Sequence, residues 1–299
     1  MAEEKPDPIE EYRSLVRAVA ARIELERAFG LEAARLPNLP AAPPPRPEPP
    51  RAARRTRRRK TAAQPRSQPT TSPPRRQPAT PPEPALKVTA ETSMGLFEQK
   101  DYQIEIPEGL SKQEKLDHLA AAIADCRLCP LHAGRTQVVF GDGNPDADLM
   151  FIGEAPGHDE DVQGIPFVGR AGQLLTRIIN AIEFDRSEVY IANINKCRPP
   201  NNRAPVPDEM ARCVPFLLKQ IEIIEPKVIC LLGATAVRGL LGIREGITRL
   251  RGRFIEWRGI LVMPTYHPAY LLRNPAGKRD VWEDVQKVRD AVRAAQRGK

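Results

Sequence analysis

Four short apolar runs, separated by segments of helical periodicity, dominate the second half of this chain. Each run is bounded by turn residues and lacks the polar alternation of a half-exposed strand, so we expect buried parallel strands. They cover residues 149–152, 189–192, 228–232 and 260–263. Helical spacing extends over residues 113–126, 173–184, 208–224, 234–241 and 282–296. This alternation predicts an α/β fold: a three-layer α/β/α sandwich with a mostly parallel four-stranded central sheet.

A proline-rich, basic segment precedes this region. Residues 37–87 hold 16 of the 32 prolines, and their twelve Lys/Arg against two acids give a net charge of +10, whereas the whole chain carries +8. Such a composition cannot build a packed core, so we expect disorder with polyproline II character. The positive run either attracts DNA phosphates without reading sequence or is a self-repelling linker, and both readings can hold.

Residues 8–36 show helical periodicity, and an isolated helix there would dock on a protein partner or on the main domain. We therefore divide the chain into an N-terminal helical segment (1–36), a disordered Pro/Arg-rich linker (37–95) and a folded domain (96–299). No apolar run reaches the roughly 20 residues of a membrane span, and the acidic N-terminus does not fit a secretory signal. We expect a monomer in the cytoplasm, associated with the nucleoid in a bacterium.

Polar motifs follow the predicted strands at their carboxyl ends, where ligands bind in open α/β sheets. Gly153, Glu154 and Ala155 open a Gly-Pro turn that leads to Glu160. Phe167 lies in a glycine-rich loop and is either a loop anchor or a stacking platform for a flat base. Asn193 ends the second run; its amide suits a pyrimidine edge, although Asn is also a common turn residue.

The last strand leads into His267, which could donate to an oxygen that gains negative charge but could equally be structural. Leu271 and Leu272 beside Arg273 would suit a wedge that levers a base from the duplex, or a helix that packs on the sheet. Three further cations are phosphate contacts or surface charge: Lys196, Arg198 and Arg203.

Five cysteines in a chain expected to stay in a reducing compartment do not predict disulfides. Cys126 and Cys129 form a Cys-x2-Cys pair, and Cys197 and Cys213 could complete a tetrathiolate site for structural Zn²⁺ or an iron–sulfur cluster. Cys230 lies in an apolar run and is expected to be a core thiol.

Together these motifs resemble the family 4 uracil-DNA glycosylases, the iron–sulfur, thermophile-type branch of their superfamily, over roughly residues 110–295. The resemblance is carried by Gly-Glu-Ala-Pro-Gly, Pro-Phe-Val-Gly-Arg-Ala-Gly-Gln, Lys-Cys-Arg-Pro-Pro-Asn-Asn-Arg and His-Pro-Ala-Tyr-Leu-Leu-Arg, in this order with the four cysteines. It implies a [4Fe–4S] cluster on Cys126, Cys129, Cys197 and Cys213. It also implies hydrolysis of uracil from single- or double-stranded DNA by a monofunctional glycosylase of base excision repair, leaving an abasic site.

The resemblance further implies that Phe167 stacks on uracil, Asn193 reads its edge, His267 stabilises the leaving group, and Leu271 is the wedge. Several superfamily members have an Asp where this chain has Ala155, so Glu154 and Glu160 become the candidates for positioning water. Three alternatives stay open: another damaged base such as hypoxanthine as substrate, a non-catalytic metal-bound DNA-binding module, and an interaction protein that works through residues 1–87.

Overall fold

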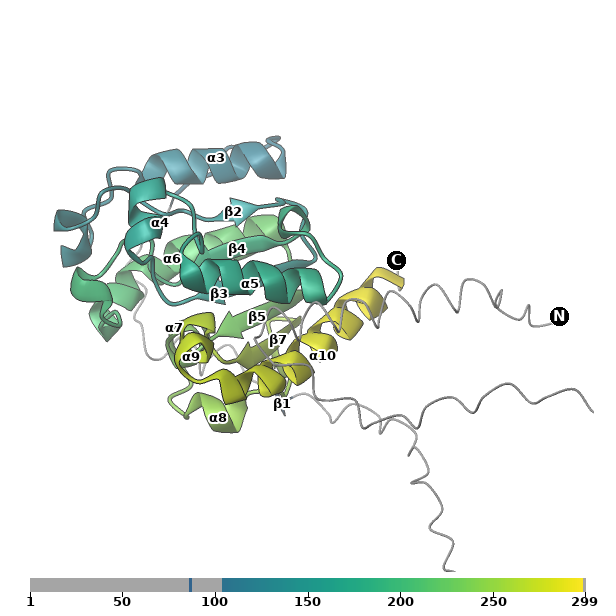
Figure 1. Ribbon diagram of the computed structural model, residues 1–299. Helices are drawn as coiled ribbons and strands as arrows, with labels where there is room; N and C mark the ends of the chain where they lie inside the picture. Colours follow the sequence, from purple (N-terminus) through teal and green to yellow (C-terminus); the bar gives the residue numbers. More distant parts are fainter. Residues whose placement is uncertain (1–85, 88–103, 298–299) are drawn as a thin grey trace, which may run out of the picture. The chain divides into compact units, whose positions relative to one another are not determined.

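A seven-stranded sheet organises the protein in the order β1-β6-β7-β5-β3-β4-β2 (Figure 1). The computed structural model describes residues 104–297 and the two-residue strand β1. The strands are β1 (Leu86–Lys87), β2 (Asp142–Gly143), β3 (Leu149–Gly153), β4 (Tyr190–Asn193), β5 (Val228–Leu232), β6 (Ile255–Trp257) and β7 (Ile260–Thr265).

The four predicted strands form the centre of the sheet. The strands β4, β3, β5 and β7 are neighbours and run parallel. The prediction of four strands is wrong in number, because β2 and β6 pair antiparallel at the two sides and β1 pairs parallel with β6. These added strands are only two or three residues long, so they depend on a neighbour's unpaired backbone and leave no periodic signal in the sequence.

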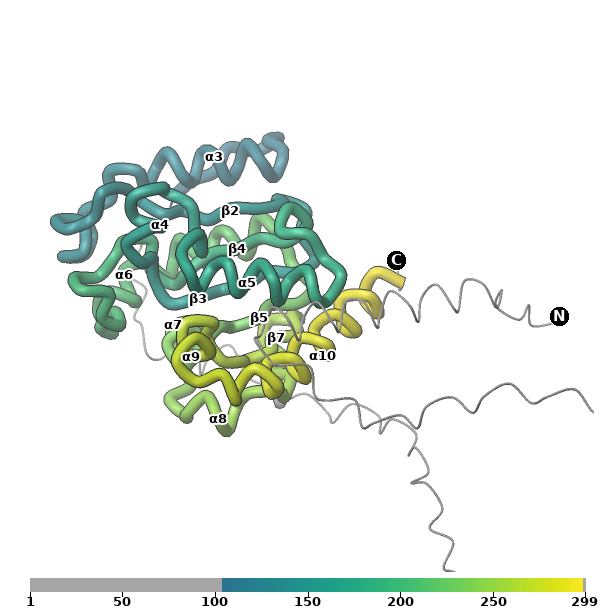
Figure 2. Tube along the Cα trace, in the orientation of Figure 1, coloured from purple at the N-terminus to yellow at the C-terminus, as the bar shows by residue number. Residues whose placement is uncertain are grey.

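Helices cover both faces of the sheet, as expected for a three-layer sandwich. One face packs against α3 (Lys112–Ile123), α6 (Pro207–Ile224) and α7 (Ala234–Leu241). The other packs against α5 (Arg170–Ala181) and the long α10 (Lys278–Arg297), and Figure 2 shows α10 crossing the side of β5 and β7. Successive side chains of a strand point to opposite faces, so Met150 and Ile152 join the first core and Leu149 and Phe151 the second.

Three short helices border the carboxyl edge of the sheet or lie beside it: α4 (His158–Gln163), α8 (Ile247–Leu250) and α9 (Pro268–Arg273). The 3₁₀ turns are η1 (Pro130–Ala133), η2 (Arg186–Glu188), η3 (Pro200–Asn202) and η4 (Pro275–Gly277). Helix α6 starts with proline at its first position, and the carboxylate of Glu209 accepts the Val206 N–H at 2.9 Å. A backbone donor at the helix start is thereby satisfied, which fixes where α6 begins beside β4.

Several predictions fall on residues outside those described, namely the helix over 8–36 and nearly all of the linker. Leu86 and Lys87 add to the edge of β6, so the prediction of disorder fails for these two residues, and the rest of it lies outside the described part of the chain. Within residues 104–297, no helix is both long and apolar enough to cross a membrane.

Candidate functional site

A cavity of about 500 Å³ opens at the carboxyl ends of β3 and β4. Gly153 and Asn193 are the last residues of these strands and are partners in the parallel ladder. The loops after β3, β4 and β7 supply the walls, including Glu154, Phe167 and His267. The structure therefore brings together residues that lie more than 100 positions apart in the sequence, at the edge where the strand pattern predicted a ligand.

Asn193 forms the floor of this cavity. Its side chain is buried, and its Oδ1 has no hydrogen-bond partner within the described protein. A buried acceptor without a partner costs free energy, about 1–3 kcal/mol, unless a ligand supplies a donor. Gly153 makes this arrangement possible, because a Cβ at that position would lie 2.4 Å from both Asn193 Oδ1 and Phe167 Cζ. Any side chain at position 153 would close the space between the amide and the aromatic ring.

Phe167 presents its ring to the same space. The ring centroid lies 5.6 Å from that of His267, with 31° between the two planes. Its backbone has a φ of +54°, in the left-handed region that a non-glycine residue rarely adopts. The loop reverses tightly behind the ring, because a Cβ on Gly172 would lie 1.9 Å from the Phe167 carbonyl oxygen. Position 172 is therefore restricted to glycine by the path of the backbone.

His267 caps helix α9. Its Nδ1 accepts the Ala269 N–H at 3.1 Å, so this nitrogen carries no proton and the neutral ring has its proton on Nε2. Burial, and to a lesser extent the positive charge of Arg273, lower the pKa of His267 to about 4. The imidazole is therefore neutral at physiological pH and offers a single N–H donor.

The two candidate carboxylates occupy different environments. Glu154 is half-buried and lines the cavity directly after β3. Glu160, from α4, accepts three backbone N–H groups: Gly157 at 3.1 Å, Val168 at 3.0 Å and Gly169 at 2.9 Å. These contacts engage both oxygens of Glu160, so of the two it is Glu154 that is the freer to orient a small molecule in the cavity.

Comparison with known proteins agrees with this geometry. Residues 140–286 match the sequence profile of the uracil DNA glycosylase superfamily. The type-4 uracil-DNA glycosylase of Thermotoga maritima is 48% identical over 187 residues, which are 61% of this chain and 97% of the relative. That of Saccharolobus solfataricus is 46% identical over 188 residues, 60% of this chain and 87% of the relative.

The chain belongs to the type-4 uracil-DNA glycosylases. The matched stretches cover about three fifths of this chain and most of the length of each relative. Within this glycosylase domain, two residues predicted to meet DNA lie elsewhere.

The first correction concerns Lys196, which was predicted to contact phosphate. Its side chain is 1% exposed, and its ammonium donates to the Asn193 carbonyl at 3.1 Å and to Gln220 Oε1 at 2.5 Å. Burial lowers the pKa of Lys196 to about 8. Neither a phosphate contact nor surface charge describes Lys196, because Gln220 and a backbone carbonyl hold its ammonium inside the core.

The second correction concerns Leu271, predicted as the wedge. It is fully buried and packs in the core under α9, so it is not presented to DNA. The neighbouring side chains Tyr270 and Leu272 are 39% and 38% exposed. A six-residue helix turns by about 100° per residue, so one position decides which leucine faces the core and which faces solvent.

Two of the predicted phosphate contacts are at the surface. Arg273 is exposed and lines the cavity, as expected for a residue predicted to meet DNA. Arg203 also lines the cavity, but its guanidinium forms a two-pronged ion pair with the buried carboxylate of Glu209, at 2.7 and 2.8 Å. Arg198, exposed only in part, hydrogen-bonds Asn202 and His158. Contact of Arg198, Arg203 and Arg273 with DNA phosphates stays a prediction.

The four predicted metal ligands line one small apolar cavity between η1 and α6. Two N–H groups point at their sulfurs: the Lys196 backbone N–H donates to Cys213 Sγ at 3.2 Å, and Arg135 donates to Cys197 Sγ at 3.3 Å. Burial raises the pKa of the Cys213 thiol to about 12. In the described part of the chain, no group of three Cys, His or acidic side chains lies close enough together to hold a metal ion. Cys230 is buried in the core as predicted.

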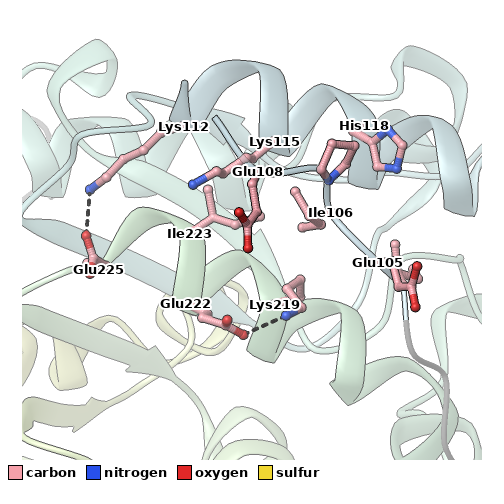
Figure 3. A pocket seen from close by; sticks show the side chains of 12 residues that line it. Glu105, Ile106, Glu108, Lys112, Lys115, His118, Lys219, Glu222, Ile223 and Glu225 are labelled. Carbon is pink, nitrogen blue, oxygen red and sulfur yellow. Dashed lines mark hydrogen bonds and ion pairs between the residues drawn. The ribbon is translucent and has the colours of Figure 1, made fainter. Parts of the chain in front are cut away.

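A second groove, of about 790 Å³, lies at the opposite edge of the sheet, between the start of α3 and the end of α6 (Figure 3). Two ion pairs lie in its wall: Lys112 pairs with Glu225 at 3.3 Å, and Lys219 with Glu222 at 2.9 Å. It holds none of the residues of the sequence motifs. The cavity at the carboxyl ends of β3 and β4 is therefore the candidate functional site.

Proposed function

We propose that this protein hydrolyses the N-glycosidic bond between uracil and deoxyribose in DNA, which releases free uracil and leaves an abasic site for base excision repair. The observation that carries the proposal is the unpartnered, buried Oδ1 of Asn193 at the floor of a cavity walled by Phe167 and His267. A base inside a duplex cannot reach such a floor, so the nucleotide must be flipped out of the stack.

The amide of Asn193 selects uracil by its pattern of donors and acceptors. Uracil offers an N3–H donor beside a 4-carbonyl acceptor, which match Oδ1 and Nδ2 of the amide. Cytosine presents an N3 acceptor and a 4-amino donor, the opposite pattern. A buried mismatch of two polar pairs is strongly unfavourable, so cytosine is rejected by the desolvated groups it leaves without partners.

His267 holds the charge that leaves with the base. Cleavage of the bond places negative charge on uracil O2 and positive charge on the sugar. The neutral imidazole, with its proton on Nε2, donates to O2, and this hydrogen bond strengthens as the charge grows. Ala269 keeps Nδ1 occupied, so the ring enters the reaction already in the required tautomer.

Glu154 orients the attacking water beside the sugar. An oxocarbenium-like sugar reacts with a positioned water, so a carboxylate that accepts one water hydrogen suffices, and Ala155 in the same loop has no group for this task. Glu160 contributes through the loop that it holds and not by contact with the substrate. On the DNA side, Tyr270 and Leu272 are the exposed apolar groups that fill the space left by the flipped base, with Arg273 on the backbone.

Release of uracil from an oligonucleotide tests the proposal. Metal-loaded protein is incubated with single- and double-stranded oligonucleotides that carry one uracil, and in parallel with hypoxanthine in the same position. We expect an alkali-labile site at uracil and little or none at hypoxanthine. Release of hypoxanthine but not uracil would move the activity to another damaged base, and release of neither would leave a DNA-binding module.

The four cysteines suit a [4Fe–4S] cluster, with structural Zn²⁺ as the alternative. The donor set is four sulfurs in an apolar cavity, and two N–H groups already face two of them, as sulfurs with thiolate character require. Cys126, Cys129, Cys197 and Cys213 would hold the group, and bound there it ties the segment after α3 to the loop after β4 and to α6.

Replacement of Cys213 by serine is expected to abolish retention of the metal and to lower the melting temperature, because the closed tetrathiolate loses a ligand. Iron, zinc and acid-labile sulfide are measured on purified protein. Cys230→Ala is the matched control, since it removes a buried cysteine outside the cavity and should keep the metal content of the wild type. One zinc and no sulfide would decide for the alternative metal; wild-type metal content in Cys213→Ser would contradict the site.

We propose that the basic segment 37–82 holds the glycosylase on DNA by charge alone. Deletion of residues 1–82 leaves β1 in place and is expected to preserve kcat at low salt. The dependence of log affinity on log salt should become shallower by about 0.9 for each phosphate that the segment neutralises in the full-length protein. Titration of DNA binding across a salt series measures this slope, with a full-length variant carrying glutamine at Arg54, Arg55, Arg57, Arg58 and Arg59 beside it. Equal slopes for all three proteins would show that the tail does not meet DNA.

A further inference from the structure

Phe167 stands in a backbone conformation that needs external support. With a φ of +54° on a bulky non-glycine residue, the loop between α4 and α5 carries strain of its own. Such a conformation persists only where surrounding contacts determine it. The peptide group between Phe167 and Val168 is the natural place to look for those contacts, because its rotation sets where the ring points.

Arg186 hydrogen-bonds the carbonyl side of this peptide. Its Nη1 donates to the Phe167 carbonyl at 3.2 Å, and its Nη2 donates to the Pro166 carbonyl at 2.6 Å. Asp142, from β2, lies 3.7 Å from Nη2 and keeps the guanidinium oriented. Arg186 belongs to η2, directly before β4, so the support for the ring lies in the segment that leads into the strand ending at Asn193.

Glu160 hydrogen-bonds the N–H side of the same peptide. Its Oε1 accepts the N–H groups of Val168 and Gly169, at 3.0 and 2.9 Å, and its Oε2 accepts the Gly157 N–H at 3.1 Å. The carboxylate therefore joins the loop after β3 to the loop that carries the ring. The carbonyl of the Phe167–Val168 peptide bonds a cation and its N–H bonds an anion, and hydrogen bonds to charged partners are stronger than those between neutral groups.

We propose that Arg186 and Glu160 are positioning residues that clamp the Phe167–Val168 peptide and so hold the Phe167 ring parallel to a flipped base. The proposal rests on the proposed function, in which Phe167 stacks on uracil. Neither clamp residue touches the base. Both act through the backbone of Phe167, so their effect should vanish when the ring is absent.

A double-mutant cycle tests this dependence. Arg186→Ala is expected to lower kcat/KM for uracil excision by tenfold or more, to weaken inhibition by free uracil by a similar factor, and to be partly rescued by Arg186→Lys, which keeps one charged donor. In a Phe167→Ala background the same Arg186→Ala change should add less than twofold. Arg293→Ala, which breaks a surface ion pair with Glu183, is the matched control and should keep wild-type kinetics. Additive losses in the cycle would overturn the proposal.

Hydrogen exchange provides a readout that does not depend on activity. In the wild type the Val168 and Gly169 amides are bonded to Glu160 and should exchange slowly; in Arg186→Ala and Glu160→Gln they should exchange faster, with the rest of the domain unchanged. Unchanged exchange at these two amides would also overturn the clamp. A wild type that releases no uracil would defeat the proposed function, while the exchange rates would still decide whether the clamp exists.

Discussion

Replacement of His267 by alanine is expected to lower the single-turnover rate of uracil release by about 10²- to 10³-fold, the usual loss when one donor to a developing oxyanion is removed. The affinity for uracil-containing DNA should change little, because the hydrogen bond from Nε2 strengthens mainly as O2 becomes charged. Rapid-quench measurement of base release with enzyme in excess separates this step from product release.

The His267→Ala variant also loses the cap of α9, worth about 1 kcal/mol of stability. His267→Asn separates the two effects, since an asparagine oxygen can again accept the Ala269 N–H but has no equivalent of Nε2. We expect His267→Asn to recover the melting temperature and to remain as slow as His267→Ala. Recovery of the rate in His267→Asn would mean that the cap matters and the imidazole does not.

The lowered pKa of His267 sets the pH dependence of the same step. Because the folded pKa is about 4 and the ordinary value is 6.5, the folded protein binds fewer protons than the unfolded chain between these values. The stability that this group contributes is therefore present above pH 6.5 and is lost as the pH falls toward 4. The rate of uracil release should not change with the protonation of His267 from neutral pH down to within one unit of its pKa. Below that pH the rate should fall, because protonation of Nδ1 breaks the hydrogen bond from the Ala269 N–H.

Replacement of Asn193 by alanine is expected to abolish most excision, with a loss on the order of 10³-fold or more, because the site no longer pairs the N3–H and 4-carbonyl of uracil and leaves both desolvated. The same change should remove an unsatisfied buried oxygen, so the melting temperature should not fall in proportion. Competition between uracil- and cytosine-containing oligonucleotides measures the discrimination directly.

Asn180→Ala is the matched control for Asn193→Ala, since it removes an exposed amide from α5. It should leave both rate and discrimination unchanged. If Asn193→Ala kept the wild-type preference for uracil, another group would read the base, and the orphan oxygen would be only a structural defect.

The centre of the sheet was predictable because its strands are buried on both faces and appear as uninterrupted apolar runs; Val228–Leu232 and Ala234–Leu241 match the predicted bounds. The placement of Gly153, Asn193 and His267 at one edge followed from the rule that parallel strands end together. Their proximity is confirmed by the cavity that all but Gly153 line, with Gly153 beside Asn193 in the ladder.

The features that were missed depend on three-dimensional partners. Burial of Lys196 depends on Gln220, and the choice between Leu271 and Leu272 depends on the phase of one short helix. Arg186 carried no sequence signal, because it hydrogen-bonds backbone carbonyls about 20 positions away and its ion-pair partner Asp142 is also distant in the sequence. A cation that serves a peptide group has no complementary residue type by which it could be recognised.

Asn193 and Cys197 are separated by only three residues, and the intervening Lys196 returns its ammonium to the carbonyl of Asn193 while its own N–H faces Cys213. Lys196 thus joins the cavity that Asn193 lines to the cysteine cavity through one short segment. An inserted or deleted residue between Asn193 and Cys197 would shift the floor of the first cavity relative to the cysteines, and both sites would be lost together.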